Sequence, residues 1–280
     1  MSAIPGLKKK LKSILATGKL SKAMKTVAAV KLSRLSETTR WSALVVEEYR
    51  RLMPNGGEYA PDAAGEENRP ETAVVFGSER GFCGGFDREL LIFFMDWAAK
   101  NGLPPHLLVC GAEIARLLEA EGFVPERVFS LGETPAIGDC EPLFETLEAL
   151  RAGRTDYPVT LIRPLYKNTL TQIPTATVVP LEPTRCAPEI RDGLWVPAMP
   201  TVMTAVGRAW TRAVLYNALQ ETALGAQAAT LVTMRSAYDT SEEYRETLLG
   251  EIHRLRQSEV TADVIETASE RSKKGEKADG

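Results

Sequence analysis

The chain has 280 residues, of which 44% are hydrophobic and 25% are charged, and its formal net charge is −3. These values are ordinary for a soluble, folded protein of one or two domains. The charge is unevenly spread, because residues 1–40 hold ten Lys and Arg residues against the single acidic residue Glu37. The beginning of the chain is therefore basic and the remainder is acidic.

Several classes of protein are excluded by what the sequence lacks. It has no run of about 18 apolar residues, which a membrane-spanning helix requires, and no secretory signal. The cysteines form no CxxC pair, which argues against a zinc site and for reduced, mostly buried thiols. We therefore expect a soluble, intracellular protein without a metal site. The cysteines are Cys83, Cys110, Cys140 and Cys186.

The placement of proline divides the chain into two arms and a middle. Of 17 prolines, 16 fall between Pro54 and Pro200. In residues 1–53, apolar side chains recur at three- and four-residue steps, which predicts one helix of roughly fifty residues with a single apolar stripe. Gly18 interrupts this stripe at a cost of about 1 kcal/mol relative to Ala. The stripe consists of Ile4, Leu7, Leu11, Ile14, Met24, Val27, Ala28, Leu35, Val45, Tyr49 and Leu52.

The middle of the chain alternates between strand and helix patterns. Residues 54–70 are a polar loop rich in Gly and Pro, and residues 71–199 are expected to form the α/β domain. Strands are predicted at 72–76, 106–110, 127–130, 158–163 and 175–181, and helices at 87–100, 112–121 and 140–152. This alternation indicates a Rossmann-like α/β domain with a largely parallel sheet.

The second arm, residues 200–280, is predicted to be helical from Thr201 to about Ser269. At the α-helical rise this is a rod on the order of 100 Å, too long to be buried in a chain of this size. Residues recur every seven positions, which implies a left-handed supercoil. One row is Val202, Ala209, Tyr216, Ala223, Thr230, Ala237 and Tyr244, and the other is Val206, Ala213, Gln220, Gln227, Met234, Ser241, Leu248 and Leu255.

The two arms predict an antiparallel coiled coil with the α/β domain on its side. The second arm is longer, so its part up to about Gly250 is expected to pair with residues 4–52. The excess beyond about Glu251 has few large apolar residues and is marginal as an isolated helix in water. We expect that this overhang is ordered inside a partner.

Residue patterns alone leave three functions open. The glycine-rich loop 77–85 could cradle a phosphate between a strand and a helix, as in a Rossmann-like nucleotide-binding enzyme. It lacks the GxGxxG and GxxxxGK[ST] patterns, and Glu79 and Asp87 would repel phosphate, so tight-turn and packing roles are favoured. The basic arm could instead serve an adaptor for nucleic acid or an anionic membrane, contact an acidic protein surface, or be only a solvated helix face. No catalytic constellation includes either histidine, His106 or His253.

Four segments together resemble one known family. They are residues 11–32 (LKSILATGKLSKAMKTVAAVKL), 78–87 (SERGFCGGFD), 166–181 (YKNTLTQIPTATVVPL) and 251–261 (EIHRLRQSEVT). In this order and spacing they are similar to the γ subunits of the F-type rotary ATP synthases. The resemblance covers both arms and the middle of the chain, so it is more specific than any single motif.

The resemblance implies that the two terminal helices form a shaft inside a ring of α and β subunits. The α/β domain would sit at the foot of the shaft, beside the ε subunit and the c-ring of the membrane sector. Catalysis would take place on the β subunits, so this chain would have no catalytic site and bind no cofactor. Rotation would couple transmembrane movement of H⁺ or Na⁺ to ATP synthesis or hydrolysis. The expected location is peripheral, on the cytoplasmic face of a prokaryotic inner membrane.

Residue by residue, the resemblance implies two kinds of position. Contacts with the α/β ring are expected at Met24, Lys25, Arg256, Gln257 and Thr261. A structural role in the loop of the α/β domain is expected for Arg80, Gly81, Cys83, Gly84 and Gly85.

The sequence also departs from the family pattern, at Gly18, Val30, His253 and in the charged tail 269–280. These departures indicate a divergent branch, and a charged tail does not suit an apolar bearing at the tip of the shaft.

Overall fold

The computed structural model describes residues 4–53, 71–154, 157–181 and 196–276, with side chains to residue 268. The expectations for the loop 54–70, for Cys186 and for the side chains of the charged tail lie outside this description. The chain forms two compact units, Met1–Lys25 with Met234–Gly280 and, separately, Thr26–Thr233. Each unit is described by itself below.

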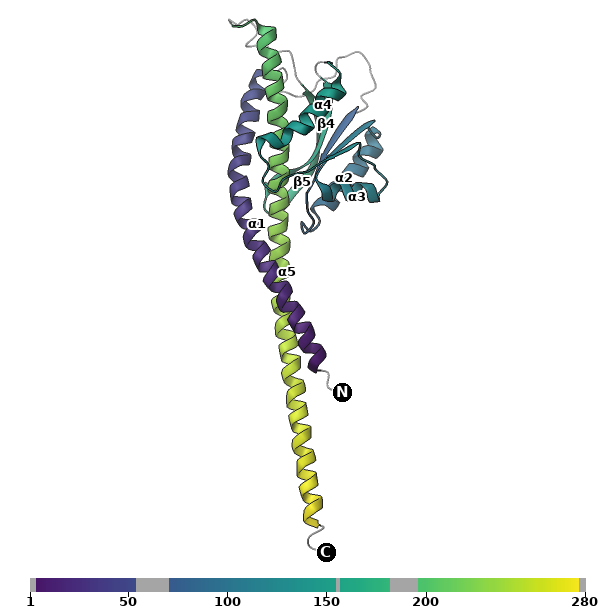
Figure 1. The fold of residues 1–280 in the computed structure, drawn as a ribbon, viewed down its shortest axis with the longest axis vertical. Helices are drawn as coiled ribbons and strands as arrows, with labels where there is room; N and C mark the ends of the chain where they lie inside the picture. The colour runs from purple at the N-terminus through teal and green to yellow at the C-terminus, as the bar shows by residue number, and fades with distance from the viewer. Residues whose placement is uncertain (1–3, 54–70, 155–156, 182–195, 277–280) are drawn as a thin grey trace. The chain divides into compact units, whose positions relative to one another are not determined.

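The unit Thr26–Thr233 contains one five-stranded sheet (Figure 1). Its strands are β1 (Thr72–Phe76), β2 (His106–Cys110), β3 (Arg127–Phe129), β4 (Tyr157–Asn168) and β5 (Thr171–Leu181), in the order β3-β2-β1-β4-β5. All neighbouring strands are parallel except β4 and β5, which pair antiparallel. The largely parallel sheet predicted from the sequence is therefore confirmed.

The last two strands are longer than the sequence pattern predicts. The predicted bounds 158–163 and 175–181 stop next to Pro164 and Pro174, whereas both strands continue through these prolines. These two prolines lie opposite each other in the antiparallel ladder. Pro164 lies beyond Ile162, the last residue of β4 that pairs with β1, and Pro174 is on the edge strand β5. Proline is tolerated where no further strand needs its missing N–H.

Helices cover both faces of the sheet (Figure 1). On one face, α2 (Phe86–Asn101) and α3 (Ala112–Ala120) pack against Ala73 and Val75 of β1. On the other, α4 (Glu141–Arg151) and α5 (Met199–Glu276) pack against Val74 and Phe76. Successive residues of a strand point to opposite faces, so both faces of β1 are buried. A short 3₁₀ turn, η2 (Ile137–Cys140), precedes α4, where the sequence predicts one helix over 140–152.

In this unit, α1 (Ile4–Leu52) runs antiparallel to α5. Leu35 packs against Ala223 and Leu224. Further along α1, Thr38 donates a hydrogen bond to Gln220 (2.9 Å) and Ser42 donates one to Asn217 (2.8 Å). Partners on α5 thus move down the sequence as those on α1 move up.

The unit Met1–Lys25 with Met234–Gly280 has the same antiparallel pairing. Gly18 faces Ser241, and a Cβ atom at Gly18 would lie 3.4 Å from the Ser241 Cβ atom. Gly18, which interrupts the apolar stripe of α1, therefore lies where α1 and α5 are in close contact. Ile4 of α1 and Ile252 of α5 are both buried. The buried part of α5 therefore ends at Ile252, two residues beyond the predicted limit at Gly250.

Some residues assigned to the apolar seams are exposed instead. Val27 and Val45 on α1 have exposed fractions of 52% and 47%, and Tyr244 on α5 has 59%. A stripe drawn at strict three- and four-residue steps drifts around a long straight helix. The prediction of one continuous stripe is therefore wrong at these positions.

Truncation of Leu35 should reveal how much the interhelix contact contributes. Leu35 is 1% exposed, whereas Leu20 on the same helix is 60% exposed. Leu35→Ala is expected to lower the free energy of unfolding by about 2–5 kcal/mol, because it removes buried methyl groups and leaves a cavity. Leu20→Ala should change it by less than about 0.5 kcal/mol. Urea unfolding of both variants measures the difference, and equal losses would contradict the assigned packing.

Candidate functional site

The glycine-rich loop after β1 packs against α5. The Cys83 thiol is buried and lies 3.3 Å from the Thr230 hydroxyl of α5. Gly84 has a φ of 60°, in the left-handed region, and a Cβ atom there would lie 2.7 Å from the Thr233 hydroxyl oxygen. Both the backbone conformation and the available space therefore require glycine. Arg80, Gly81, Cys83, Gly84 and Gly85 lie together in this one loop.

A buried carboxylate closes the same loop. Ser78 donates its backbone N–H to one carboxylate oxygen of Asp87 (2.7 Å) and its hydroxyl to the other (2.6 Å). Burial raises the pKa of Asp87, while the hydrogen bonds from Ser78 oppose that rise. Asp87 is thus the acceptor that shapes the turn into α2.

A second carboxylate of the loop, Glu79, bonds backbone N–H groups at the start of α3 and after β3. Glu79 accepts hydrogen bonds from the backbone N–H of Leu131 (2.8 Å) and of Ala112 (3.3 Å). Ala112 is the first residue of α3, so the positive end of that helix already faces a negative charge. This arrangement favours the turn and packing interpretation over a phosphate cradle. Among the residues that the structure describes, no cluster of His, Cys, Asp and Glu is arranged to hold a metal ion.

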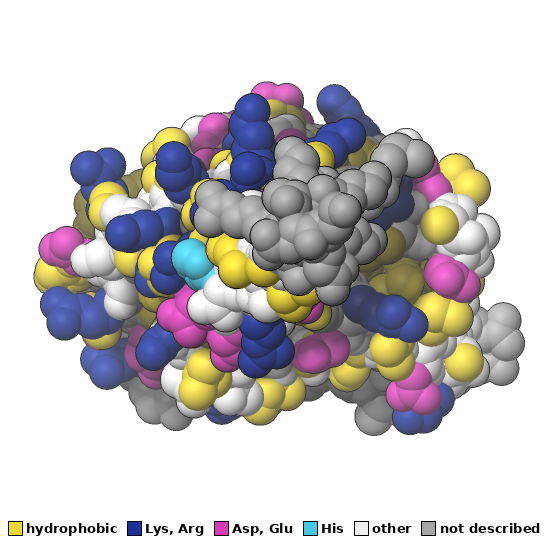
Figure 2. Space-filling view, turned by 90° about the horizontal axis from the view of Figure 1, so that it is seen from below, with side chains coloured by type: hydrophobic (Ala, Val, Ile, Leu, Met, Phe, Trp, Pro, Cys, Tyr) yellow, Lys and Arg dark blue, Asp and Glu magenta, His cyan; other side chains and the backbone are white. Residues whose placement is uncertain are grey.

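Met24 and Lys25 of α1 are half-buried. The Lys25 ammonium nitrogen lies 4.9 Å from the centre of the Tyr238 ring of α5, and that of Lys22 lies 6.0 Å from it. A cation over an aromatic face is stabilised by the ring quadrupole, which fixes where the Lys25 charge is presented. Figure 2 shows Lys and Arg side chains spread over the face seen from below.

Arg256, Gln257 and Thr261 lie on the exposed end of α5. Every side chain described from 253 to 268 is exposed. The Thr261 hydroxyl donates to the carbonyl oxygen of Gln257 (2.8 Å), so these two residues share one face of the helix. At a helical rise of 1.5 Å per residue, Arg256 is roughly 27 Å along the axis from Tyr238, so the structure does not bring Lys25 and Arg256 together.

Three exposed apolar residues beside these positions were missed by the sequence reasoning. Val260, Val264 and Ile265 have exposed fractions of 61%, 62% and 63%. The four-residue step from Val260 to Val264 is a signal that they share a face. Together with Gln257 and Thr261 they form an exposed surface that is partly apolar and partly polar.

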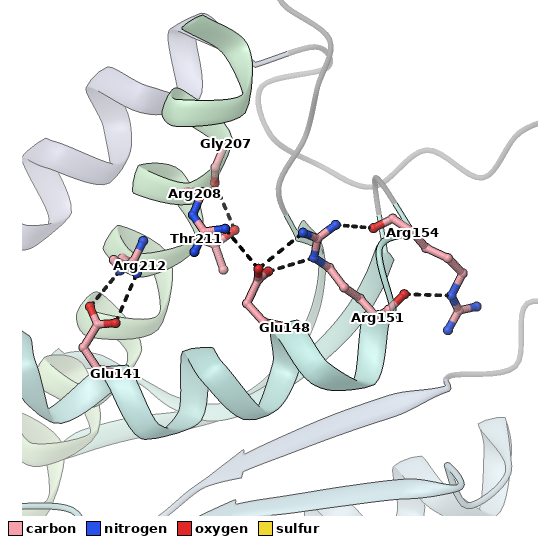
Figure 3. A network of polar contacts seen from close by, with 8 residues as sticks. All are labelled: Glu141, Glu148, Arg151, Arg154, Gly207, Arg208, Thr211 and Arg212. Carbon is pink, nitrogen blue, oxygen red and sulfur yellow. Dashed lines mark hydrogen bonds and ion pairs between the residues drawn. The ribbon is translucent and has the colours of Figure 1, made fainter. Parts of the chain in front are cut away.

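A polar network joins the α/β domain to α5 (Figure 3). The Arg212 guanidinium donates to both carboxylate oxygens of Glu141 in α4 (2.7 and 3.1 Å), which lowers the pKa of Glu141. It also lies 3.8 Å from the centre of the Phe144 ring. Two turns further along α4, Glu148 accepts from Arg151 (2.7 Å) and from Arg208 (3.2 Å). These paired charges attach α4 to the side of α5 in a fixed orientation.

Comparison with known proteins assigns this architecture. The model of the family described as ATP synthase matches residues 4–269. The ATP synthase γ chain of Polynucleobacter asymbioticus is 25% identical over 285 residues, covering 95% of this chain and 97% of that one. The ATP synthase γ chain of Acidithiobacillus ferridurans is 26% identical over 274 residues, with 92% of each chain covered. The chain belongs to the ATP synthase γ chain family.

Solved structures agree with this family in fold. A chain of the rotor of the Euglena gracilis mitochondrial ATP synthase aligns with a TM-score of 0.65 at 15% identity, covering 92% of this chain and 99% of that one. A chain of the central stalk and c-ring of the Tetrahymena thermophila mitochondrial ATP synthase aligns with a TM-score of 0.58 at 17% identity, covering 78% and 99%.

Membership in the γ chain family gives the role. The chain is the rotor shaft subunit of an ATP synthase, a non-catalytic component of the ATPase complex. Within the described part of the chain, no helix is both long enough and apolar enough to cross a membrane.

The buried carboxylate of Asp87 should make the stability depend on pH. Its pKa is raised in the folded state, so the folded chain holds this proton to higher pH than the unfolded chain does. Stability should therefore fall as the pH rises from the ordinary Asp value through the raised one. Asp87→Asn is expected to remove this contribution to the pH dependence of the free energy of unfolding. Urea unfolding across that pH range measures it.

Asp96→Asn is the matched control, because Asp96 is exposed and pairs with Lys100 within α2. It should leave the part of the slope assigned to Asp87 in place. A wild-type slope that persists in Asp87→Asn would rule out the assignment to the buried carboxylate.

Proposed function

We propose that this chain turns inside a ring of α and β subunits and touches that ring at two places. One is the segment of α1 with Met24 and Lys25. The other is the exposed end of α5 with Arg256, Gln257 and Thr261. The observation that carries the proposal is the uninterrupted exposure of α5 from 253 to 268.

A helix end with no covering element is marginal in water by itself. Here it also displays Val260, Val264 and Ile265 to solvent. Apolar surface of this kind is stabilised when a partner encloses it. Arg256 adds a planar group of donors, and Gln257 adds both donors and an acceptor, so a loop of the ring with carboxylate or carbonyl groups would fit beside them.

The asymmetry of the shaft supplies the mechanism. Chemically identical β subunits meet different faces of one chain, and each is biased towards a different conformation. Moving a two-state element from 1:99 to 99:1 requires about 5.5 kcal/mol of differential contact. Rotation passes these biases from one β subunit to the next, which couples ion movement to ATP synthesis or hydrolysis.

The remaining partners follow from the same family role. The α/β domain is proposed to contact the ε subunit and the c-ring, which carry rotation between the membrane sector and the shaft. The chain would then be a peripheral subunit on the cytoplasmic face of a prokaryotic inner membrane. It would have no catalytic site of its own, in a complex that transports protons or sodium ions. The carboxylates of Glu79 and Asp87 support this, because two negative charges held in the glycine-rich loop and at the start of α2 would repel a phosphate there.

Co-expression with α and β subunits tests the proposal. We expect a stable complex with a single copy of this chain for three β subunits, and ATP hydrolysis that depends on its presence. Purification of the complex and measurement of its ATPase activity provide the readout. If α and β assemble and hydrolyse ATP equally well without this chain, it is not their shaft.

Arg256→Ala should lower the coupled turnover of the assembled complex by roughly tenfold or more, because a charged hydrogen bond to the ring contributes about 1.5–3 kcal/mol. Helicity of the isolated chain should not change, since Arg256 is exposed. ATP-driven ion uptake into sealed vesicles and circular dichroism measure the two quantities.

The matched control is Arg254→Ala, two residues away on the same exposed segment and on another face of the helix. It should keep most of the coupled turnover. Equal losses in the two variants, or a loss of helicity in Arg256→Ala, would count against a specific contact at Arg256.

A further inference from the structure

The segment between β3 and η2 is held by several surrounding elements. Residues 131–136 have no helix or strand of their own. Even so, Leu131 and Pro135 are buried, and Glu133 between them is half-buried. A connection of this kind usually runs exposed over a surface. What holds this one in place is a set of directed polar contacts from α1, α5 and the loop after β1.

The first contact fixes the start of the segment. Glu79, in the loop after β1, accepts the backbone N–H of Leu131 (2.8 Å) and the hydroxyl of Ser130 (2.9 Å). A carboxylate that accepts two such bonds holds the backbone in one position. The segment therefore leaves β3 in a fixed direction.

The second contact reaches α1. The Glu133 carboxylate forms an ion pair with Lys31 of α1, and its other oxygen lies 2.7 Å from a guanidinium nitrogen of Arg80. The side chains of Lys31 and Glu133 are only 26% and 30% exposed. Partial burial weakens screening by salt, so this pair holds more firmly than an exposed one.

The third contact reaches α5. Gln220, which is 1% exposed, donates its side-chain N–H to the carbonyl oxygen of Pro135 (2.5 Å). Its side-chain oxygen accepts the hydroxyl hydrogen of Thr38 from α1 (2.9 Å). One buried amide thus connects α5, α1 and the segment 131–136 at a single point.

We propose that residues 131–136 are a clasp that fixes the α/β domain against rotation about the two helices, with Lys31, Glu133 and Gln220 as positioning residues for torque transfer. This rests on the rotor function proposed above. Apolar packing resists separation but has no preferred direction. The Arg212–Glu141 and Arg208–Glu148 pairs already hold the domain to α5. Directed bonds from the segment 131–136 reach α1 as well as α5, so they add resistance to a twist of the domain around the two helices.

The experiment uses the assembled complex with its ring fixed to a surface. A bead is attached through Val124→Cys, an exposed position on the α/β domain, and the angular spread of the bead is recorded while the ring is paused. Glu133→Gln and Lys31→Met should each lower the torsional stiffness roughly twofold or more, with a matching loss of ATP-driven ion uptake. The double variant should show no further loss, because the two side chains act as one pair, and Lys31→Arg should retain the wild-type stiffness.

Asp96→Asn is the control, since it removes an exposed carboxylate of the same domain that pairs within α2. It should leave the angular spread unchanged. The clasp is overturned if Glu133→Gln keeps the wild-type angular spread, if Asp96→Asn widens it equally, or if Lys31→Arg fails to retain it. A wild-type chain that does not assemble with α and β would instead remove the rotor function itself, so the two failures are distinguishable.

Discussion

The constraint on which the rest of the structure depends is the encasement of α5 in the unit Thr26–Thr233. Nearly every residue of the helix between 217 and 228 is buried, because α1 covers it on one side and the sheet domain on others. Only small side chains allow neighbours to approach from several directions at once, and this segment includes Ala218, Ala223, Gly225 and Ala226. At Gly225, a Cβ atom would already lie 3.0 Å from the ring of Phe86. The size of these residues therefore fixes how closely the domain and both helices can meet.

Small side chains bury little apolar area, so buried polar contacts determine which residues of α1 lie opposite which residues of α5. Thr38 meets Gln220, and Ser42 meets Asn217. A slip of one helical turn between α1 and α5 would leave these groups buried without partners, at a cost of about 1–3 kcal/mol each. Polar residues at interhelix positions are known to fix register in coiled coils at some expense of stability. The same amide of Gln220 also reaches Pro135, so the alignment of the helices and the seating of the domain depend on shared atoms.

The sequence predicts the elements better than the contacts between them. The lack of proline in the two arms, together with helical periodicity, was sufficient to predict both long helices. The bounds of β1 and β2 were predicted correctly because buried strands read as short apolar runs. The lengths of β4 and β5 were wrong, because the tolerance of Pro164 and Pro174 depends on which strands lie beside them. The roles of Glu79 and Glu133 could not be predicted at all, because each joins residues that are far apart in the chain. The exposed residues Val260 and Val264 are signalled only weakly in the sequence, by their four-residue spacing.

The two parts of α5 differ in burial, and this difference suits the two tasks of a shaft. Where the helix is encased, its backbone and side chains are held by apolar contacts and by polar bonds from several elements, so local opening is costly. From 253 to 268 its side chains are exposed, and the free energy of ordering there has little contribution from the chain itself. The part of the helix that must stay fixed to the α/β domain while it transmits torque needs to be encased. The end of α5 that we propose meets successive partner surfaces needs exposed side chains, because contacts made within the chain would compete with contacts to each partner.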